Sequence, residues 1–396
     1  MLLKYFYDEK IAHASYMVGC QATGEALVVD PGRVVAPYLA AAKDNGLRII
    51  GATETHIHAD FICGSRELAE QTGATLYLSD EGDENWKYDF APDFSSRLVK
   101  DGDTFLVGNI KIEVMHTPGH TPEHLSFIVT DTAGADQPMG IFTGDFVFVG
   151  DVGRPDLLEE AAGIQGTSEP AARQMFRSLK RFKTLPDYLQ VWPAHGAGSA
   201  CGKALGAIPS STVGYEKRFN WALRETEEER FVKALLAGQP EPPTYFAMMK
   251  KLNKSARNVL TSELSLPEEV DVEQLKASLD QGATVVDTRP SRAFAAGHIA
   301  GTINIPRNND FTNWAGWLLN YNNPFYLIVD ADHLAQIVRD LAAIGLDNIG
   351  GYLEPSAVEV WPEALQTYGE TTPTAIADKA ASGEVTIIDV RAGSEW

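Results

Sequence analysis

The stretch Thr55-His56-Ile57-His58-Ala59-Asp60 follows directly on the apolar segment Arg48–Thr53, and this junction decides the fold. Side chains two residues apart on an extended chain point to the same side, so both imidazoles and the Asp60 carboxylate face one way. Imidazole and carboxylate groups are common protein ligands of zinc and iron. The junction therefore predicts a metal site at the C-terminal end of a buried strand.

Three further loops place a histidine or a carboxylate directly after an apolar strand. They are His116-Thr117-Pro118-Gly119-His120-Thr121, Phe142-Thr143-Gly144-Asp145 and Trp192-Pro193-Ala194-His195-Gly196. Because the pattern recurs, a polar loop with incidental histidines is the weaker interpretation. Two histidines and one carboxylate with open coordination positions are the ligands of non-haem Fe(II) oxygenases, and the same groups suit zinc.

Strand patterns with glycine-bearing turns dominate the first part of the chain and are interrupted by helical patterns. The predicted strands are Ala26–Asp30, Arg48–Thr53, Thr75–Leu78, Thr104–Val107, Ile110–His116, Leu125–Val129, Met139–Thr143 and Tyr188–Trp192. The predicted helices are Val35–Asn45, Cys63–Gln71, Pro170–Lys183, Val213–Leu236 and Thr244–Val259. This pattern indicates an α/β protein with two sheets and helices packed outside them.

A second unit follows a boundary near Leu264–Glu269, and it contains an internal repeat. ATVVDTRPSRAF, with Asp287 and Arg289, reappears as VTIIDVRAGSEW, with Asp389 and Arg391, 389 − 287 = 102 residues later. We expect three domains, at residues 1–263, 264–370 and 371–396. The last would be the start of a second copy, truncated after about one strand and too short to bury a core of its own.

The four loops carry the motifs HxHxD, TPGHT, TGD and PAHG, in this order along the chain. Through this set, residues 1–260 resemble the metallo-β-lactamase superfamily, which implies an αββα sandwich. THIHADF and TGDFVFVGDVGRPDL resemble its persulfide dioxygenase branch, especially bacterial enzymes fused to rhodanese domains. The resemblance implies one Fe(II) per chain held by His56, His120 and Asp145. His58 would lie close by, as an additional ligand or in hydrogen-bonding contact with the ligands.

The dinuclear hydrolases of the superfamily carry a histidine directly after the aspartate of the first motif, where this chain has Phe61. A second metal would thus lose an imidazole ligand. Asp60 and His195 would be left to hold it alone or to form hydrogen bonds.

The implied reaction is the oxidation of a low-molecular-weight persulfide by O2, which releases sulfite and regenerates the thiol; the carrier could be glutathione, coenzyme A or a similar thiol. Arg154 would pair with a carboxylate of that carrier, or form a structural ion pair with Asp151 or Asp156. Cys201, in a small-residue loop after His195, would accept or relay sulfane sulfur, or be an inert spacer. A role for His195 in substrate binding is also expected.

The second unit resembles a rhodanese domain through Val285–Arg289 and the run Ala296–Pro306, which implies an α/β domain with a parallel sheet. Active rhodaneses carry a cysteine after the next buried strand, and here Asp330 follows Phe325–Val329. Because no cysteine occurs between Gly202 and Trp396, we expect no sulfurtransferase activity from this domain; the missing part of a second copy would supply it. Its sheet is still expected to bury Val285, Val286, Ile303 and Leu327–Val329.

Composition narrows the choice of partners. Of 396 residues, 33 are basic and 54 acidic, giving a net charge of −21, so nucleic acid and anionic membranes are not expected partners. Three well-separated cysteines, no signal peptide and no long apolar segment indicate a cytoplasmic protein, and a homo-oligomer stays open. His116 and His124 are expected to pack beside the metal loops rather than to bind metal.

Two other functions fit the same residues. A glyoxalase II-like zinc thioesterase would use these loops to hydrolyse a glutathione-type thioester, although Phe61 and the rhodanese-like unit argue against it. A sulfur-sensing or sulfur-carrier protein would use a structural metal with Cys201 as the reporter thiol, and it would bind metal without consuming O2.

Overall fold

The computed structural model describes residues 1–157, 159, 166–239, 241–261 and 264–390. The chain divides into two compact units, Met1–Leu264 with Arg339–Gly345 and Ser265–Val338 with Leu346–Trp396. The expected junction after residue 263 borders undescribed positions, and Arg391 of the predicted repeat lies outside the described residues. Within the described ranges, no helix has the length and apolar character that a membrane crossing requires.

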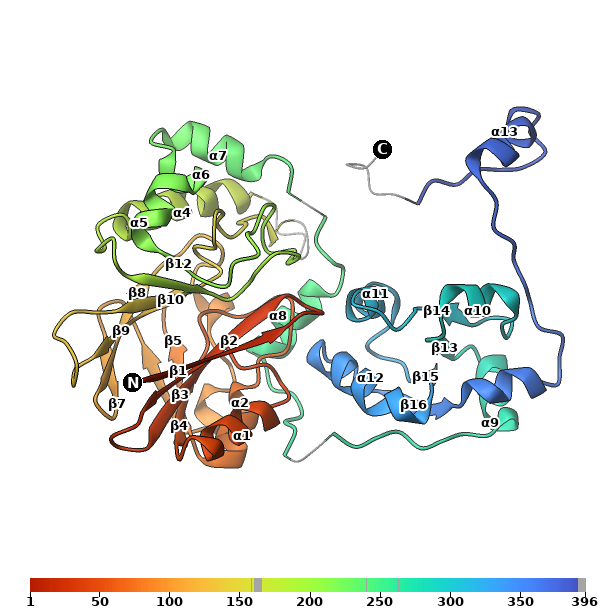
Figure 1. The fold of residues 1–396 in the computed structure, drawn as a ribbon, viewed down its shortest axis with the longest axis horizontal. Coiled ribbons are helices and arrows are strands. Elements are labelled where there is room, and N and C mark those ends of the chain that lie inside the picture. The colour runs from red at the N-terminus through yellow and green to blue at the C-terminus, as the bar shows by residue number, and fades with distance from the viewer. Residues whose placement is uncertain (158, 160–165, 240, 262–263, 391–396) are drawn as a thin grey trace. The chain divides into compact units, whose positions relative to one another are not determined.

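The N-terminal unit contains two six-stranded sheets (Figure 1). The first, in spatial order, is β1 (Leu2–Asp8), β2 (His13–Cys20), β3 (Glu25–Val29), β4 (Arg48–Thr53), β5 (Thr75–Ser79) and β6 (Ser96–Val99). Pairing is antiparallel from β1 to β3 and parallel from β3 to β6. The sequence did not predict β1, β2 or β6. Every residue of β2 is buried, but His13, Ser15 and Gly19 interrupt its apolar residues, so this strand does not show the continuous apolar run that marks a fully buried strand.

The second sheet contains β7 (Thr104–Val107), β8 (Ile110–His116), β9 (Leu125–Asp131), β10 (Gly140–Gly144), β11 (Gln190–Pro193) and β12 (Ser211–Thr212). Its spatial order is β12-β11-β10-β9-β8-β7, and only the β10–β11 pair is parallel. All eight strands that the sequence predicts are present, within two residues at either end. The strands that the sequence did not predict are therefore β2 and the sheet-edge strands β1, β6 and β12.

Apolar side chains from both sheets, including Val18, Leu27, Ile112 and Phe127, form one buried core between the sheets. Helices cover the two outer faces, so the expected αββα sandwich is confirmed. The helices of this unit are α1 (Ala36–Asp44), α2 (Ser65–Thr72), α4 (Ser168–Phe182), α5 (Val213–Phe219), α6 (Trp221–Arg224), α7 (Glu228–Leu236) and α8 (Phe246–Lys254), with short 3-10 turns at Glu84–Trp86 and Ala91–Asp93.

The single helix predicted over Val213–Leu236 is wrong, because the segment forms three helices, α5 to α7. Asn220 has extended backbone angles and its side chain accepts a hydrogen bond from the Ala222 backbone, which starts α6. Glu225 is also extended and ends α6. Asparagine commonly caps a helix in this way, so an amphipathic pattern continues across a break that periodicity alone does not reveal.

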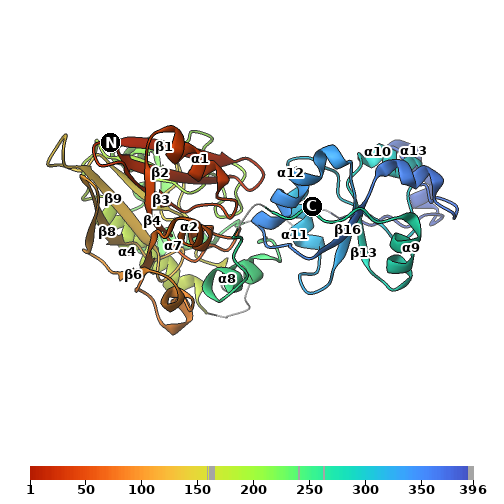
Figure 2. The same ribbon diagram turned by 90° about the horizontal axis from the view of Figure 1, so that it is seen from below.

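The C-terminal unit has a four-stranded parallel sheet, as expected. Its spatial order is β14 (Ile303–Asn304), β13 (Thr284–Asp287), β15 (Phe325–Ile328) and β16 (Ile349–Leu353). Helices α9 (Val272–Asp280) and α10 (Ser291–Ala296) lie on one side of the sheet, and α11 (Phe311–Leu318) and α12 (Ala331–Ala343) on the other (Figures 1 and 2). A 3-10 helix at Pro355–Val360 follows β16. Of the expected core residues, Ile303 is only half-buried, because it belongs to the edge strand β14.

The predicted repeat is visible as a helix without its strand. Shifting α9 by 102 residues gives 374–382, one residue from the observed α13 (Pro373–Ala381). None of the α13 residues is buried, and Ile387, Ile388 and Val390 are exposed where the first copy has β13. Within the described part of the chain this segment has no neighbouring strand to pair with, so no strand forms.

Candidate metal centre

The four predicted loops meet where the two sheets adjoin. One follows β4 of the first sheet, and the others follow β8, β10 and β11 of the second. Backbone hydrogen bonds join them, from Leu125 to the Thr55 carbonyl (2.7 Å) and from Ala194 to the Gly144 carbonyl (3.0 Å). The strand ends therefore hold the loops in register with one another.

The structure brings His56, His120 and Asp145 together as a buried donor group whose ligand atoms all lie within 4.8 Å of one another. Asp145 Oδ2 is 3.4 Å from His120 Nε2 and 4.0 Å from His56 Nε2. All three side chains are at least 97% buried. This is the set of residues that the sequence assigned to one metal.

Hydrogen bonds on the far side of each imidazole decide which nitrogen faces the group. The Thr55 hydroxyl donates its one proton to Asp30 Oδ2 (2.9 Å), so at 3.0 Å it accepts from His56 Nδ1. His120 Nδ1 donates to the Arg154 carbonyl (2.8 Å). His195 Nδ1 donates likewise to the Ala12 carbonyl (2.9 Å). In the neutral imidazole each Nε2 is therefore left with a lone pair, as a metal ligand requires.

Several of these atoms have no hydrogen-bond partner although they are buried. They are His56 Nε2, His195 Nε2 and both carboxylate oxygens of Asp145 and of Asp60. A buried polar group without a partner costs about 1–3 kcal/mol. A cation placed among these lone pairs and carboxylates removes that cost, so the donor set fits a metal ion.

The electrostatics agree with neutral imidazole ligands at the first group. Burial and the adjacent His58 and His120 hold the pKa of His56 well below its usual value. Burial also lowers the pKa of His120, although Asp145 opposes this. Metal binding requires unprotonated imidazole, so these histidines are already in the binding form near neutral pH.

The loop after β10 is shaped by a close contact. Gly144 has a left-handed φ of +50°, and a Cβ there would lie 2.6 Å from His124 Nε2. That nitrogen accepts a hydrogen bond from the Asp145 backbone (3.0 Å), and His124 Nδ1 bonds the Thr117 hydroxyl (2.8 Å). His116 bonds the Pro122 carbonyl (2.8 Å). Both His124 and His116 lie outside the donor groups, and His124 positions Asp145.

A second donor group contains Asp60, His195 and Cys201, all buried. His195 Nε2 is 3.1 Å from Asp60 Oδ2 and 3.4 Å from Asp145 Oδ1. Burial lowers the pKa of His195, but the two carboxylates outweigh it and raise the pKa above its usual value. A proton or a cation therefore satisfies the same atoms. Burial, with Asp60 and Asp145, raises the pKa of Cys201 well above that of a free thiol.

Phe61 follows Asp60 of this second donor group in the chain. Its ring packs against the rings of His13, 3.8 Å between centroids, and His58, 4.4 Å. His58 Nε2 lies 3.0 Å from Asp30 Oδ1, and its Nδ1 has no partner. Burial disfavours the charged form of His58, but Asp30 raises its pKa to about 9. His58 belongs to neither donor group.

His13 and Asp30 are site residues that the sequence analysis missed. His13 lies on β2, is 3% exposed and has an Nε2 without a partner. Asp30 directly follows β3 and accepts hydrogen bonds from the backbone and hydroxyl of Thr55. The position of Asp30 at a strand end was an available signal. His13 gave none, because it stands within an apolar strand on a hairpin.

Arg154 is 1% exposed and makes a paired contact with Asp156, Nε to Oδ1 at 2.9 Å and Nη2 to Oδ2 at 2.7 Å. Its Nη1 donates to the Ala200 carbonyl (3.3 Å). This is the structural ion pair that the sequence left open beside a role in substrate binding.

Comparison with known proteins agrees with this architecture. Residues 10–195 match the family model of the metallo-beta-lactamase superfamily, and residues 271–352 match that of the rhodanese-like domain. A crystal structure of a metallo-beta-lactamase from Staphylococcus aureus subsp. aureus COL is 46% identical. The match covers 89% of this chain and 99% of that one, with a TM-score of 0.81.

Two curated relatives are more distant. The Bos taurus protein named persulfide dioxygenase ETHE1, mitochondrial, is 28% identical over 240 residues, which are 59% of this chain and 80% of the relative. A hydroxyacylglutathione hydrolase of Prochlorococcus marinus (strain MIT 9211) is 30% identical over 175 residues, 44% of this chain. The chain spans 62% of that hydrolase.

Proposed function

The chain belongs to the metallo-beta-lactamase superfamily, and from this premise we propose that it is a non-haem Fe(II) dioxygenase that oxidises a low-molecular-weight persulfide. The observation that carries the proposal is the donor group of His56, His120 and Asp145, with its unpaired ligand atoms. Two imidazoles and one carboxylate leave coordination positions for substrate and O2. The similarity to the Bos taurus persulfide dioxygenase supports the same reaction.

The reaction balances as one persulfide, one O2 and one water giving one thiol and one sulfurous acid, which ionises to sulfite. The sulfur–sulfur bond breaks, and four electrons pass from the persulfide to O2. A bound Fe(II) supplies this electron transfer, which Zn²⁺, having no redox chemistry, does not.

The residues of the chain hold the reactants and move a proton. His56 and His120 are fixed in one orientation by Thr55 and by the Arg154 carbonyl. His195, beside Asp60, is assigned to substrate binding, and its raised pKa suits it to give a proton to the departing thiolate.

We further propose that Cys201 accepts or relays sulfane sulfur, because its thiol adjoins the His195 imidazole, a base that can take up the thiol proton although burial, Asp60 and Asp145 raise the pKa of Cys201. Cys201→Ser is expected to leave the iron content unchanged and to slow turnover with one persulfide donor more than with another. Steady-state O2 uptake with two donors measures this. Equal kinetics for both proteins with every donor would assign Cys201 to packing.

A zinc thioesterase is the second candidate function. The group of Asp60, His195 and Cys201 favours it, because these residues supply a carboxylate, an imidazole and a thiol for a second cation. The hydroxyacylglutathione hydrolase relative points the same way.

Metal analysis of protein purified without oxygen, combined with O2 uptake on glutathione persulfide and on coenzyme A persulfide, separates the two functions. The dioxygenase predicts about one iron per chain and O2 consumption with sulfite release. Two zinc ions per chain, thioester hydrolysis and no O2 uptake would establish the hydrolase instead.

A further inference from the structure

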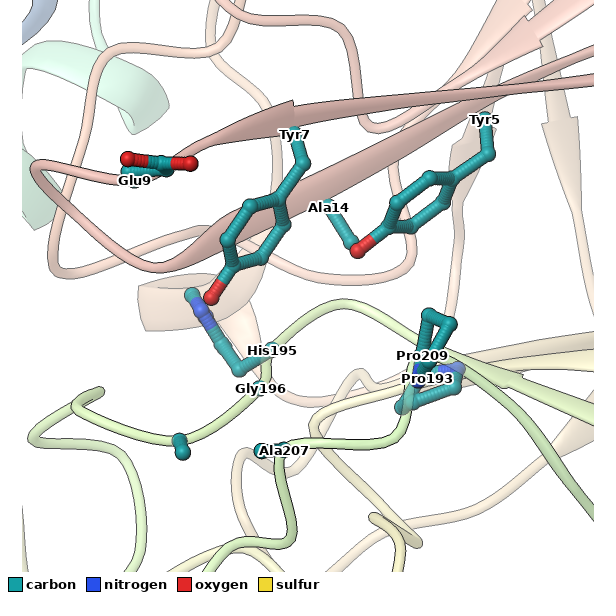
Figure 3. A pocket seen from close by; sticks show the side chains of 10 residues that line it. Tyr5, Tyr7, Glu9, Ala14, Pro193, His195, Gly196, Ala207 and Pro209 are labelled. Carbon is teal, nitrogen blue, oxygen red and sulfur yellow. The ribbon is translucent and has the colours of Figure 1, made fainter.

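A pocket of about 420 Å³ opens beside His195 (Figure 3). β1 and the segment after it contribute one wall, and β11 with the loop after it contributes the other. Its principal lining residues are Tyr5, Tyr7, Glu9, Pro193, His195 and Pro209. This volume lies within the range of small-molecule binding pockets.

His195 lies between the pocket and the donor groups. The residue lines the pocket, while its side chain is fully buried and its Nε2 lies 3.1 Å from Asp60 and 3.4 Å from Asp145. The Tyr7 hydroxyl lies close to the Gly196 backbone, because a Cβ at Gly196 would be 3.1 Å from that oxygen. Figure 3 shows the Tyr7 side chain pointing toward His195. A ligand in the pocket therefore lies next to His195, whose Nε2 faces the donor groups.

The lining of the pocket offers hydrogen bonds and flat surfaces rather than positive charge. Tyr5 and Tyr7 stack, with 5.9 Å between ring centroids and an interplanar angle of 16°. Burial, with the Tyr7 neighbour, raises the pKa of Tyr5 to about 12, so its phenol stays neutral. Among the described residues that line the pocket there is no lysine or arginine, and Glu9 supplies a carboxylate.

This lining disfavours a ligand that carries carboxylates. A partly desolvated carboxylate needs a cation or several donors, and Glu9 repels it instead. Arg154, the cation that the sequence offered for this purpose, is occupied by Asp156 and lies outside the pocket lining. An uncharged amide chain, in contrast, lies against the rings and accepts hydrogen bonds from the phenols.

We infer that the pocket binds the uncharged amide arm of the thiol carrier, of which a pantetheine-type N-acylcysteamine is the simplest example. Glutathione, with two carboxylates, is disfavoured at the same place. The inference rests on the proposed function in one respect, since it takes the bound molecule to be the carrier of the oxidised sulfur.

Binding of unreactive thioethers tests the inference on the full-length protein without any turnover. S-methylpantetheine and S-methylglutathione are titrated by calorimetry. We expect S-methylpantetheine to bind at least about fivefold more tightly, since the difference is set by one repulsive carboxylate at a partly exposed site. Equal affinity, or tighter binding of the glutathione thioether, would overturn the inference.

Charge reversal at the pocket sharpens the test. Glu9→Lys is expected to tighten S-methylglutathione by roughly three- to tenfold and to leave S-methylpantetheine within about twofold. Glu70→Lys, the same change at an exposed position on α2 outside the lining, is the matched control and should alter neither ligand. If Glu9→Lys behaves like the control, the inference is wrong.

Removing the Tyr7 hydroxyl tests whether the pocket binds the amide arm of the carrier. Tyr7→Phe is expected to weaken S-methylpantetheine by roughly three- to tenfold, the effect of one lost hydrogen bond. Unchanged affinity would contradict the assigned role of Tyr7. Since these measurements need no O2, selective binding without O2 uptake would refute only the proposed function, and O2 uptake without selective binding would refute only the pocket assignment.

Discussion

The donor groups of the N-terminal unit and the polar cluster of the C-terminal unit both lie at the ends of strands, but they differ in how their atoms are paired. At the end of β13, Arg289 binds both oxygens of Asp287, at 3.0 and 2.6 Å. Asn304 donates to the carbonyls of both residues, at 2.8 and 2.9 Å. In the N-terminal unit, by contrast, Asp145 and Asp60 have no hydrogen-bond partner for either oxygen.

This difference separates a site from a structural cluster. Buried polar atoms are nearly always paired, so a concentration of unpaired ones indicates a place where another group completes the bonding. The Asp287 cluster has its partners within the chain and needs no ligand. Residue type alone does not distinguish the two, because both clusters contain carboxylates after apolar strands.

Removing a ligand from the donor group of His56, His120 and Asp145 is the strongest test of the difference between the two regions. Asp145→Ala and His120→Ala are each expected to lose metal and persulfide oxidation together, by at least about a hundredfold, because each change removes one of the three proposed ligands. His58→Ala should be milder, since His58 belongs to neither donor group. Elemental analysis and O2 uptake give both readouts.

His116→Ala is the control for these variants, because the His116 side chain contacts the Pro122 carbonyl and Glu81 and lies outside the donor groups. Full metal content in Asp145→Ala would contradict the assignment. Equal metal loss in His58→Ala would add His58 to the ligands.

A paired charge in the same N-terminal unit should behave in the opposite way. Glu67 is fully buried, and Arg257 Nη2 lies 2.8 Å from its Oε2. Glu67→Gln is expected to lower the free energy of unfolding by about 3 kcal/mol, since it leaves a buried guanidinium unpaired. Urea unfolding measures this, with Glu70→Gln on the same helix as the exposed control.

The Glu67 pair also has a pH signature. Burial pushes the pKa of Glu67 upward, but Arg257 and Arg33 outweigh it and hold the pKa below its usual value. A lowered pKa in the folded state stabilises the protein fully above about pH 4.5, and that stabilisation is lost as the pH falls further. The stability of Glu67→Gln should therefore depend less on pH in this acid range than that of the parent protein. Identical acid profiles would show that the pair does not stabilise the fold.

The paired cluster of the C-terminal unit should affect stability alone. Asp287→Asn is expected to destabilise that unit by about 2 kcal/mol, less than a fully buried pair because Arg289 is partly exposed. Metal content and O2 uptake should stay unchanged. Loss of metal in this variant would remove the distinction between the two regions.

The smallest expected effect concerns Asp330, where active rhodaneses carry a cysteine. The unmodified chain should form no thiocyanate from thiosulfate and cyanide. Asp330 stands directly before α12, and its carbonyl accepts from the His333 and Leu334 backbones. Asp330→Cys is expected to gain weak sulfur uptake, because a helix N-terminus lowers the pKa of a thiol. Thiocyanate formation by the unmodified chain that survives Cys201→Ser would contradict the prediction.

The sequence predicted the interior strands and the loops after them because both signals are local. An apolar run that ends in a polar residue shows where a strand stops, and four such ends gave His56, His120, Asp145 and His195. Neither β1 nor β2 gave such a signal, because polar and small residues interrupt the apolar residues of β2 and β1 carries charged residues at the sheet edge. His13 was missed together with its strand.

By itself, the sequence determined the two-sheet α/β pattern and the candidate donors, since these follow from periodicity and from residue types near one another in the chain, while the αββα sandwich and the parallel sheet were expected from the family resemblances of its motifs. Only the tertiary structure decided which atoms of those donors are free. The partner of each imidazole comes from a distant segment, as with Ala12 for His195 and Arg154 for His120. The same holds for the phenols of β1 that line the pocket beside His195. Hydrogen bonds depend on distance and angle in space, so neighbours far apart in sequence settle which lone pairs remain for a metal.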